Sequence, residues 1–211
     1  LFAGVSLFFI TLILPLQFEK QCITIGWSLE GVALLWLLRR IPHQGLKIWG
    51  AGLLIIAFVR LSLNPAVFSY HPREIYRVFN WYLYSYGIVT VCLFVGAKLL
   101  ARADDEIMGY KMTHVLNSVG TILAFLLLNI EIADYFSTGS TITFQFSGSL
   151  ARDMAYSLGW TVFALIMLVI GIRKKSRAAR FGSLGLFSIT IIKVFLHDLW
   201  RLGQLYRVGS I

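Results

Sequence analysis

The chain has 211 residues, of which 58% are apolar and only 14% are charged, and its mean hydropathy is +0.76. A water-soluble globular domain carries about 45 to 50% apolar and about 25% charged residues, so this composition excludes that class. The apolar residues come in long runs, and the 4 Pro and 18 Gly show no period, which excludes disordered, collagen-like and low-complexity chains. The composition therefore predicts a protein that crosses a membrane several times.

Seven apolar segments are long enough to predict spanning helices, each of which needs about 20 mostly apolar residues. In chain order they cover residues 1–16, 22–38, 48–63, 79–99, 112–134, 154–172 and 181–199. A membrane barrel is disfavoured, because its strands alternate apolar and polar residues whereas these runs are apolar on all faces. We predict an all-α, polytopic transmembrane helix bundle. Because residue 1 falls inside an apolar run, we expect residues 1–211 to be a single transmembrane helical domain, a segment of a larger membrane protein.

The positive charge is concentrated in loops between the predicted spans. Nineteen Lys and Arg against ten Asp and Glu give a formal charge of +9, which in a soluble protein would suggest nucleic-acid binding. Most of these cations lie in the loops 39–47, 98–111 and 173–180, and basic loops of this kind face the cytoplasm. We therefore expect these three loops to be cytoplasmic and expect no nucleic-acid partner.

Other connections carry weaker patterns. Residues 64–77 predict a helix lying on the membrane surface. Residues 141–146 alternate polar with apolar side chains and predict either a short strand or a plain surface loop. Asp104, Asp105 and Glu106 are expected to stabilise the N-terminus of the helix that follows them.

Four charged residues lie inside predicted spans, namely Glu30, Arg60, Glu131 and Lys193. Each costs roughly 2.5 to 3.5 kcal/mol on insertion into hydrocarbon, so each needs a partner or a function. A rise of about 1.5 Å per residue places Glu30 and Lys193 ~12 and ~9 Å from the outer ends of their spans, and both Glu131 and Arg60 ~5 Å. These depths predict that Glu30 faces Lys193 and that Glu131 faces Arg60. The alternative is that such pairs only fix the helix register.

A second polar group is predicted around the outer mouth of the bundle. Glu131 and Asp134 share one face of their helix, whereas Lys193, His197 and Arg201 recur every four residues along another, next to Asp198. This group can bind an anionic head group through its cations or carry out acid–base chemistry through His197. The alternative is that water and lipid phosphate simply solvate these side chains.

The other patterns in the sequence indicate no chemistry or indicate only helix packing. Cys22 and Cys92 lie at different depths, which predicts neither a disulfide nor a metal site. The chain has no phosphate-binding Gly-rich loop, no Gly-x-Ser-x-Gly and no His-x-x-x-His or Cys-x-x-Cys pair, so we expect no metal and no cofactor. Small residues at Gly182, Gly185 and Ser188, and at 50–52, predict close helix packing.

Several short segments carry a family resemblance. They are Trp-Ser-Leu-Glu-Gly at 27–31, Tyr-Ser-Leu-Gly-Trp at 156–160, Gly-Ile-Arg at 171–173 and Lys-Val-Phe-Leu-His-Asp at 193–198, followed by Tyr206 and Arg207. From about Trp27 onward, and most specifically in its last third, the chain resembles the bacterial family of predicted multi-pass membrane proteins called domain of unknown function 2339. The resemblance implies a protein of the bacterial cytoplasmic membrane with further spans outside this segment. It implies no activity and no catalytic residue, but it draws attention to Glu30, Lys193 and Asp198.

Three functions remain open at this stage. The first is binding or transport of an anionic lipid or envelope precursor in a polar cavity open to the outer face. The second is a non-catalytic scaffold or accessory subunit of a cell-envelope complex, and the third is an enzyme acting on a lipid-linked substrate. The expected partners are membrane lipid and further transmembrane helices, either of the same chain or of partner subunits.

Overall fold

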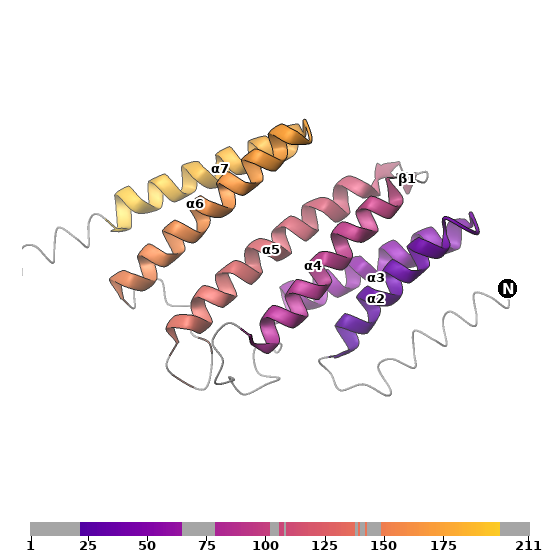
Figure 1. The fold of residues 1–211 in the computed structure, drawn as a ribbon, viewed down its shortest axis with the longest axis horizontal. Helices are drawn as coiled ribbons and strands as arrows, with labels where there is room; N and C mark the ends of the chain where they lie inside the picture. The colour runs from indigo at the N-terminus through magenta and orange to yellow at the C-terminus, as the bar shows by residue number, and fades with distance from the viewer. Residues whose placement is uncertain are drawn as a thin grey trace, which may run out of the picture. The chain divides into compact units, whose positions relative to one another are not determined.

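The computed structural model describes residues 22–64, 79–101, 106–107, 109–137, 139, 142 and 149–198, with only the backbone at residues 197 and 198. This part of the chain is built almost entirely of helices (Figure 1). They are α2 (Cys22–Leu37), α3 (Gln44–Leu63), α4 (Trp81–Leu100), α5 (Met112–Phe136), α6 (Leu150–Arg173), α7 (Arg177–Lys193) and the π-helix η2 (Val194–Asp198). The all-helical prediction is confirmed for these residues, and α2 to α7 correspond to six of the seven predicted spans.

Five of these helices are long and apolar enough to cross a membrane, namely α3, α4, α5, α6 and α7 with its continuation to Leu196. The apolar helix α2 has 16 residues and is shorter than a typical span. The predicted span at 1–16 lies outside the described residues, so a bundle of seven spans stays a prediction. The predicted surface helix at 64–77 and strand at 141–146 also fall almost entirely outside the described residues.

Three helices begin four residues earlier than the apolar runs predict, because capping side chains start them. His43 Nδ1 accepts a hydrogen bond from the Gly45 N–H at 3.0 Å and begins α3. Ser149 Oγ accepts from the Arg152 N–H and begins α6, and Ser176 Oγ accepts from the Ala179 N–H and begins α7. A capping side chain satisfies an N–H group that has no partner inside the helix, so the helix extends beyond its apolar residues.

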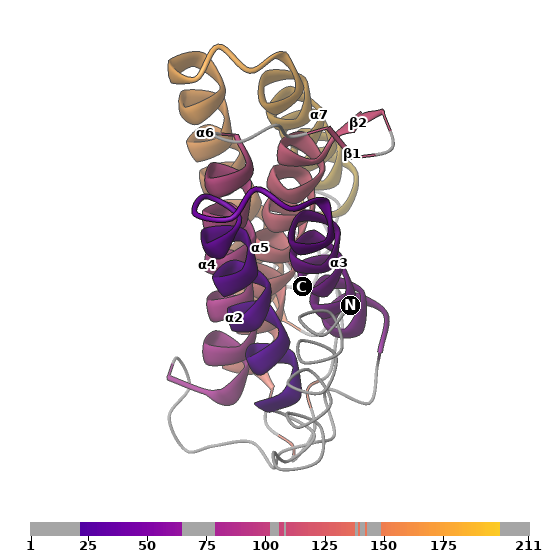
Figure 2. The same ribbon diagram turned by 90° about the vertical axis from the view of Figure 1, so that its right-hand side faces the viewer.

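The connection between α4 and α5 contains a two-stranded hairpin that the sequence analysis did not predict (Figure 2). Strand β1 (Glu106–Ile107) pairs antiparallel with β2 (Tyr110–Lys111). Gly109 turns the chain with φ of 80°, a conformation that side chains disfavour. Glu106 lies opposite Lys111, the residue before α5, and the prediction that the acidic residues 104–106 stabilise the N-terminus of α5 stays a prediction, with 104 and 105 outside the described residues. The short ladder thus places residues of opposite charge across from each other immediately before the helix.

The described residues form two compact units. The first contains α2, α3, α4, the hairpin and α5 as far as Glu131; the second contains the rest of α5, α6, α7 and η2. The prediction of a single helical domain is not tested by this division and stays a prediction.

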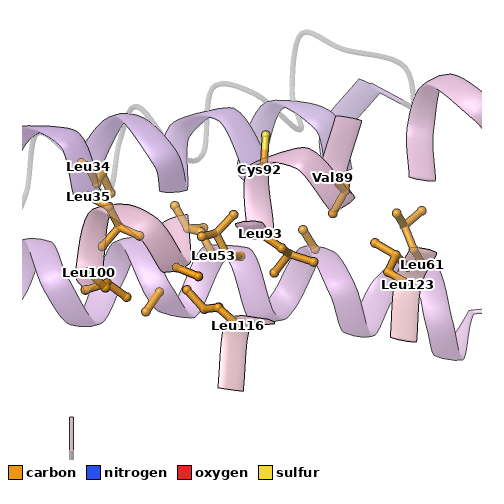
Figure 3. Packing of buried hydrophobic residues seen from close by; sticks show 14 of the residues in the cluster. Leu34, Leu35, Leu53, Leu61, Val89, Cys92, Leu93, Leu100, Leu116 and Leu123 are labelled. Atoms are coloured by element: carbon orange, nitrogen blue, oxygen red, sulfur yellow. The ribbon is translucent and has the colours of Figure 1, made fainter. Parts of the chain in front are cut away.

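The first unit has a continuous apolar core to which four helices contribute (Figure 3). The labelled side chains include Leu34 and Leu35 of α2, Leu53 and Leu61 of α3, Val89, Leu93 and Leu100 of α4, and Leu116 and Leu123 of α5. Helices α2 and α3 approach closely because glycines face each other. A Cβ atom on Gly31 would lie 2.9 Å from the Gly50 carbonyl oxygen, and one on Gly50 would lie 2.9 Å from Leu35 Cγ. The prediction of close packing around residue 50 is therefore confirmed.

The second unit is an antiparallel pair of helices, α6 and α7 (Figure 1). Their connection is tight, since a Cβ atom on Gly171 would meet Arg180 and Ala179 at 3.0 to 3.1 Å. Of the predicted packing stripe on α7, Gly182 packs against α6, since its Cβ position lies 3.5 Å from Met167 Cε. Within the described residues nothing lies within 4 Å of a Cβ on Gly185 and Ser188 is exposed, so the prediction is wrong for these two. Helix α7 instead buries Ser183 and Thr190, which lie seven residues apart on a different face.

The glycine contact predicts a difference between two matched substitutions in the first unit. Gly31→Ala should lower the free energy of unfolding, because forcing a methyl group against the Gly50 backbone costs about 1 to 3 kcal/mol. Gly52→Ala should not, because nothing lies within 4 Å of its Cβ position and alanine favours the helix by up to about 1 kcal/mol. Thermal unfolding of the full chain in detergent measures both, and equal melting temperatures would contradict the packing described for α2 and α3.

Candidate functional site

A polar contact in the first unit joins the start of α4 to the last turns of α5. Asn80 is the N-cap of α4, and its Oδ1 accepts from the Leu83 N–H at 2.8 Å. Its Nδ2 donates to Glu131 Oε2 at 3.3 Å. Only 3% of Asn80 is exposed, so its amide is held by both contacts. Asn80 thus uses one end of its amide to begin a helix and the other to orient a carboxyl group.

A second contact in this unit joins α2 and α3. The guanidinium carbon of Arg60 lies over the ring of Trp27, 5.5 Å from its centroid. Such a cation–π contact stabilises an arginine by about 0.5 to 2 kcal/mol, and most where water is excluded. Glu30 is half-buried and follows Trp27 by three residues, which places it on a neighbouring position of the same helix face.

Arg60 also lies next to an anchored carbonyl. Tyr86 of α4 donates its hydroxyl hydrogen to the Leu61 carbonyl oxygen of α3 at 2.8 Å. The last carbonyls of a helix have no partner within that helix, so this bond satisfies one of them and ties α3 to α4. Tyr86 therefore holds the backbone next to Arg60, and the ring of Trp27 contacts its guanidinium group.

In the second unit, Lys193 lies between two oxygen atoms of α6. Lys193 Nζ donates to Ser157 Oγ at 2.7 Å and to the Asp153 carbonyl oxygen at 3.1 Å. Ser157 Oγ in turn donates to the same Asp153 carbonyl at 3.2 Å. Arg152, Asp153 and Tyr156 are buried beside them on the first turns of α6. Lys193 thus connects the end of α7 to the first two turns of α6.

The structure distributes the predicted site residues between the two units. Glu30, Arg60 and Glu131 belong to the first unit, whereas Asp134, which is buried, and Lys193 belong to the second. His197 and Asp198 lie in the π-helix η2, and their side chains, like the whole of Arg201, lie outside the described part.

Both predicted charge pairs stay predictions. Glu30 belongs to the first unit and Lys193 to the second. Glu131 and Arg60 share the first unit, where Glu131 contacts Asn80 and Arg60 lies over Trp27. Among the described side chains, no three His, Cys, Asp or Glu residues are grouped so that they could hold a metal ion.

Two residues of these contacts escaped the sequence analysis as candidates. Asn80 directly precedes an apolar run, which is the usual position of a helix N-cap, so the sequence contains a signal for its place at the start of α4. The sequence contains no signal for its bond to Glu131. Ser157 lies in the segment Tyr-Ser-Leu-Gly-Trp, and only the contact with Lys193 distinguishes it from the other serines of the helices.

Comparison with known proteins identifies the family of the chain. The family model described as predicted membrane protein, domain of unknown function 2339 (DUF2339), matches residues 1–151 and 50–211, which together cover the chain. The chain belongs to this family. No curated protein and no solved structure shows significant similarity to it. DUF2339 membership establishes a membrane protein and assigns no activity, so any function has to be argued from the side chains.

The bond between Asn80 and Glu131 predicts the order of stability of three variants. Asn80→Ser keeps an oxygen for the Leu83 N–H, whereas Asn80→Asp also keeps the cap but places a second carboxyl group beside Glu131. We expect Asn80→Asp to unfold more easily than Asn80→Ser, by about 1 to 2 kcal/mol. Adding Glu131→Gln to Asn80→Asp should restore most of that difference, because the new amide can donate to the new carboxyl group. Thermal unfolding in detergent measures all three, and the absence of any restoration would contradict the contact.

Proposed function

We propose that the chain binds, or moves across the membrane, an anionic lipid or envelope precursor through a polar cavity open to the outer face of a bacterial cytoplasmic membrane. In this proposal the cations bind the negatively charged head group and the carboxyl groups keep the cations in place. The proposed ligand-binding residues are Glu30, Arg60, Glu131, Asp134, Lys193, His197, Asp198 and Arg201.

The observation that carries the proposal is that each unit fixes a cation near the end of an apolar helix. Arg60 lies three residues before the end of α3 and is held over Trp27, and Lys193 is the last residue of α7 and is held by α6. Arginine and lysine are the side chains that bind phosphate and carboxylate groups most strongly. A fixed cation binds an anion with less loss of side-chain entropy than a free one.

The direction of the helices favours the same side of the membrane for these residues. If successive helices cross the membrane, the ends of α3, α5 and α7 lie on the same side as the starts of α2, α4 and α6. Arg60, Glu131 and Lys193 lie toward the former ends, and Trp27 and Asn80 lie toward the latter starts. The predicted cytoplasmic loops 39–47, 98–111 and 173–180 lie at the opposite ends, which makes this side the outer one.

A scaffold function is the second candidate, and the exposed face of α7 favours it. This face carries small residues, Gly182 and Gly185, among exposed large apolar side chains that include Phe181, Leu184 and Ile189. Small residues on a membrane helix let another helix approach closely. A partner helix would cover this face in a scaffold, whereas lipid alone would cover it in a protein that only binds lipid.

Co-purification distinguishes the two candidates. The full chain is extracted gently, and its bound lipids and proteins are identified by mass spectrometry, alongside Arg60→Gln and the control Lys98→Gln. Lys98 is an exposed cation at the other end of α4. We expect an anionic amphiphile enriched at least tenfold over bulk lipid, lost in Arg60→Gln and retained in Lys98→Gln. Finding bulk lipid only would contradict the binding proposal, and a stoichiometric membrane protein in its place would favour the scaffold.

A further inference from the structure

We propose that the turn between α6 and α7 binds an anionic phospholipid, whose phosphate group contacts arginines of the turn and whose acyl chain lies along the exposed face of α7. This basic turn, residues 173–180, carries five exposed cations, namely Arg173, Lys174, Lys175, Arg177 and Arg180. It lies at the opposite end of α7 from Lys193 and shares no residue with the ligand-binding residues proposed above. The inference therefore goes beyond that proposed function and does not require it.

The positive charge of the basic turn is not neutralised within the described part of the chain. Helix α7 has no acidic residue, and the single one of α6, Asp153, lies about 30 Å along that helix from Arg173. Among the described residues, none of the five cationic side chains makes a hydrogen bond, an ion pair or a ring contact. Their mutual repulsion adds to the unfavourable position of cations at the positive N-terminal end of α7. A bound phosphate group would relieve both.

The backbone of the basic turn is held in one conformation. The Ser176 N–H donates to the Gly171 carbonyl oxygen at 2.9 Å, which closes the turn. Lys175 has φ of 52°, a conformation in which glycine is usual at this position after a helix, so a cation stands where the backbone alone favours glycine. The stem of Arg180 packs against the end of α6, because a Cβ atom on Gly171 would lie 3.0 Å from Arg180 Cγ. Cations on a fixed backbone bind an anion with less loss of entropy.

The exposed face of α7 continues from these cations into apolar side chains. After Arg177, exposed side chains follow at alternating intervals of four and three residues, which keeps them on one helix face: Phe181, Leu184, Ser188 and Ile191. From residue 181 to residue 191 the helix rises about 15 Å, about half of the ~30 Å hydrocarbon thickness of a bilayer. A cationic end followed by one leaflet's depth of apolar surface matches a single phospholipid molecule.

Charge favours a lipid over the other occupants of this face. A second copy of the chain in the same orientation would bring an identical basic turn against this one, and like charges in an interface disfavour association. A water-soluble anion would neutralise the cations but leave the apolar face below them uncovered. An anionic phospholipid satisfies both parts, since guanidinium groups bind phosphate through paired hydrogen bonds and acyl chains cover apolar side chains.

A photoreactive lipid tests the proposal at the site itself. The full chain is reconstituted in phosphatidylcholine vesicles that contain a small fraction of phosphatidylglycerol with a diazirine in its acyl chain, and cross-linked residues are mapped by mass spectrometry. We expect adducts on residues 181–191, at least fivefold more than from phosphatidylcholine that carries the same diazirine. Equal labelling by the two lipids would overturn the proposal. Labelling of α7 by neither lipid would also overturn it, and is the result expected if a partner helix or a second copy covers this face.

Two variants that remove the same charge test the arginines. Arg177→Gln with Arg180→Gln removes two cations of the basic turn, whereas Arg39→Gln with Lys98→Gln removes two exposed cations elsewhere. A lysine or arginine at a membrane surface strengthens its attraction to anionic lipid about fivefold. The first variant should therefore lose at least fivefold in phosphatidylglycerol adducts on residues 181–191, and the second should lose none. No loss in the first variant, or an equal loss in both, would overturn the role of the basic turn.

Two further features keep this result separate from insertion and from the proposed function. The first variant retains Arg173, Lys174 and Lys175, so the turn stays basic and the direction of insertion should not change. Arg60→Gln, which tests the ligand-binding residues proposed above, should leave the adducts on α7 unchanged. Loss of these adducts in Arg60→Gln would overturn the independence of the two surfaces.

Discussion

Hydrocarbon offers no hydrogen-bond partner, and this constraint decides how every polar side chain in the helices is placed. Most of the serine, threonine and asparagine side chains on the helices donate to a carbonyl one turn earlier in their own helix, as Thr121 does to Asn117 and Asn129 does to Phe125. Among the described residues, bonds between different helices include those of Tyr86 with the Leu61 carbonyl, Asn80 with Glu131, and Lys193 with α6. In such contacts a polar side chain also ties one helix to another, which makes them candidate sites.

The helices could be predicted from the sequence and their starts could not. Long apolar runs predict which segments are helical, because within lipid a backbone satisfies itself as a helix or a closed barrel, and barrel strands would alternate apolar and polar residues. The starts of α3, α6 and α7 depend on His43, Ser149 and Ser176, polar residues that a search for apolar runs excludes. The hairpin at 106–111 depends on a two-residue ladder and on Gly109, signals too short to recognise within a basic loop.

The candidate site could be predicted only in part, for a related reason. A charge inside an apolar run is visible in the sequence, which is how Glu30, Arg60, Glu131 and Lys193 were found. Three of them contact neutral or aromatic groups: Glu131 contacts the amide of Asn80, Arg60 the ring of Trp27, and Lys193 the hydroxyl of Ser157. Comparing the depths of charged residues can suggest pairs of opposite charge, but it carries no information about neutral or aromatic partners. Family membership adds the membrane setting and leaves the chemistry to these contacts.

The central claim is that α4, α5 and α6 cross a membrane in succession, which brings the two ends that carry Asn80 and Asp153 to one side. Single cysteines at Phe79, Ala101, Ser149 and Lys174, which flank α4 and α6, test it in a Cys22→Ser, Cys92→Ser chain labelled in intact cells with a membrane-impermeant maleimide. The account predicts that the cysteines at 79 and 149 are labelled from outside and that those at 101 and 174 are labelled only after lysis. Labelling of 79 and 149 from opposite sides would contradict it.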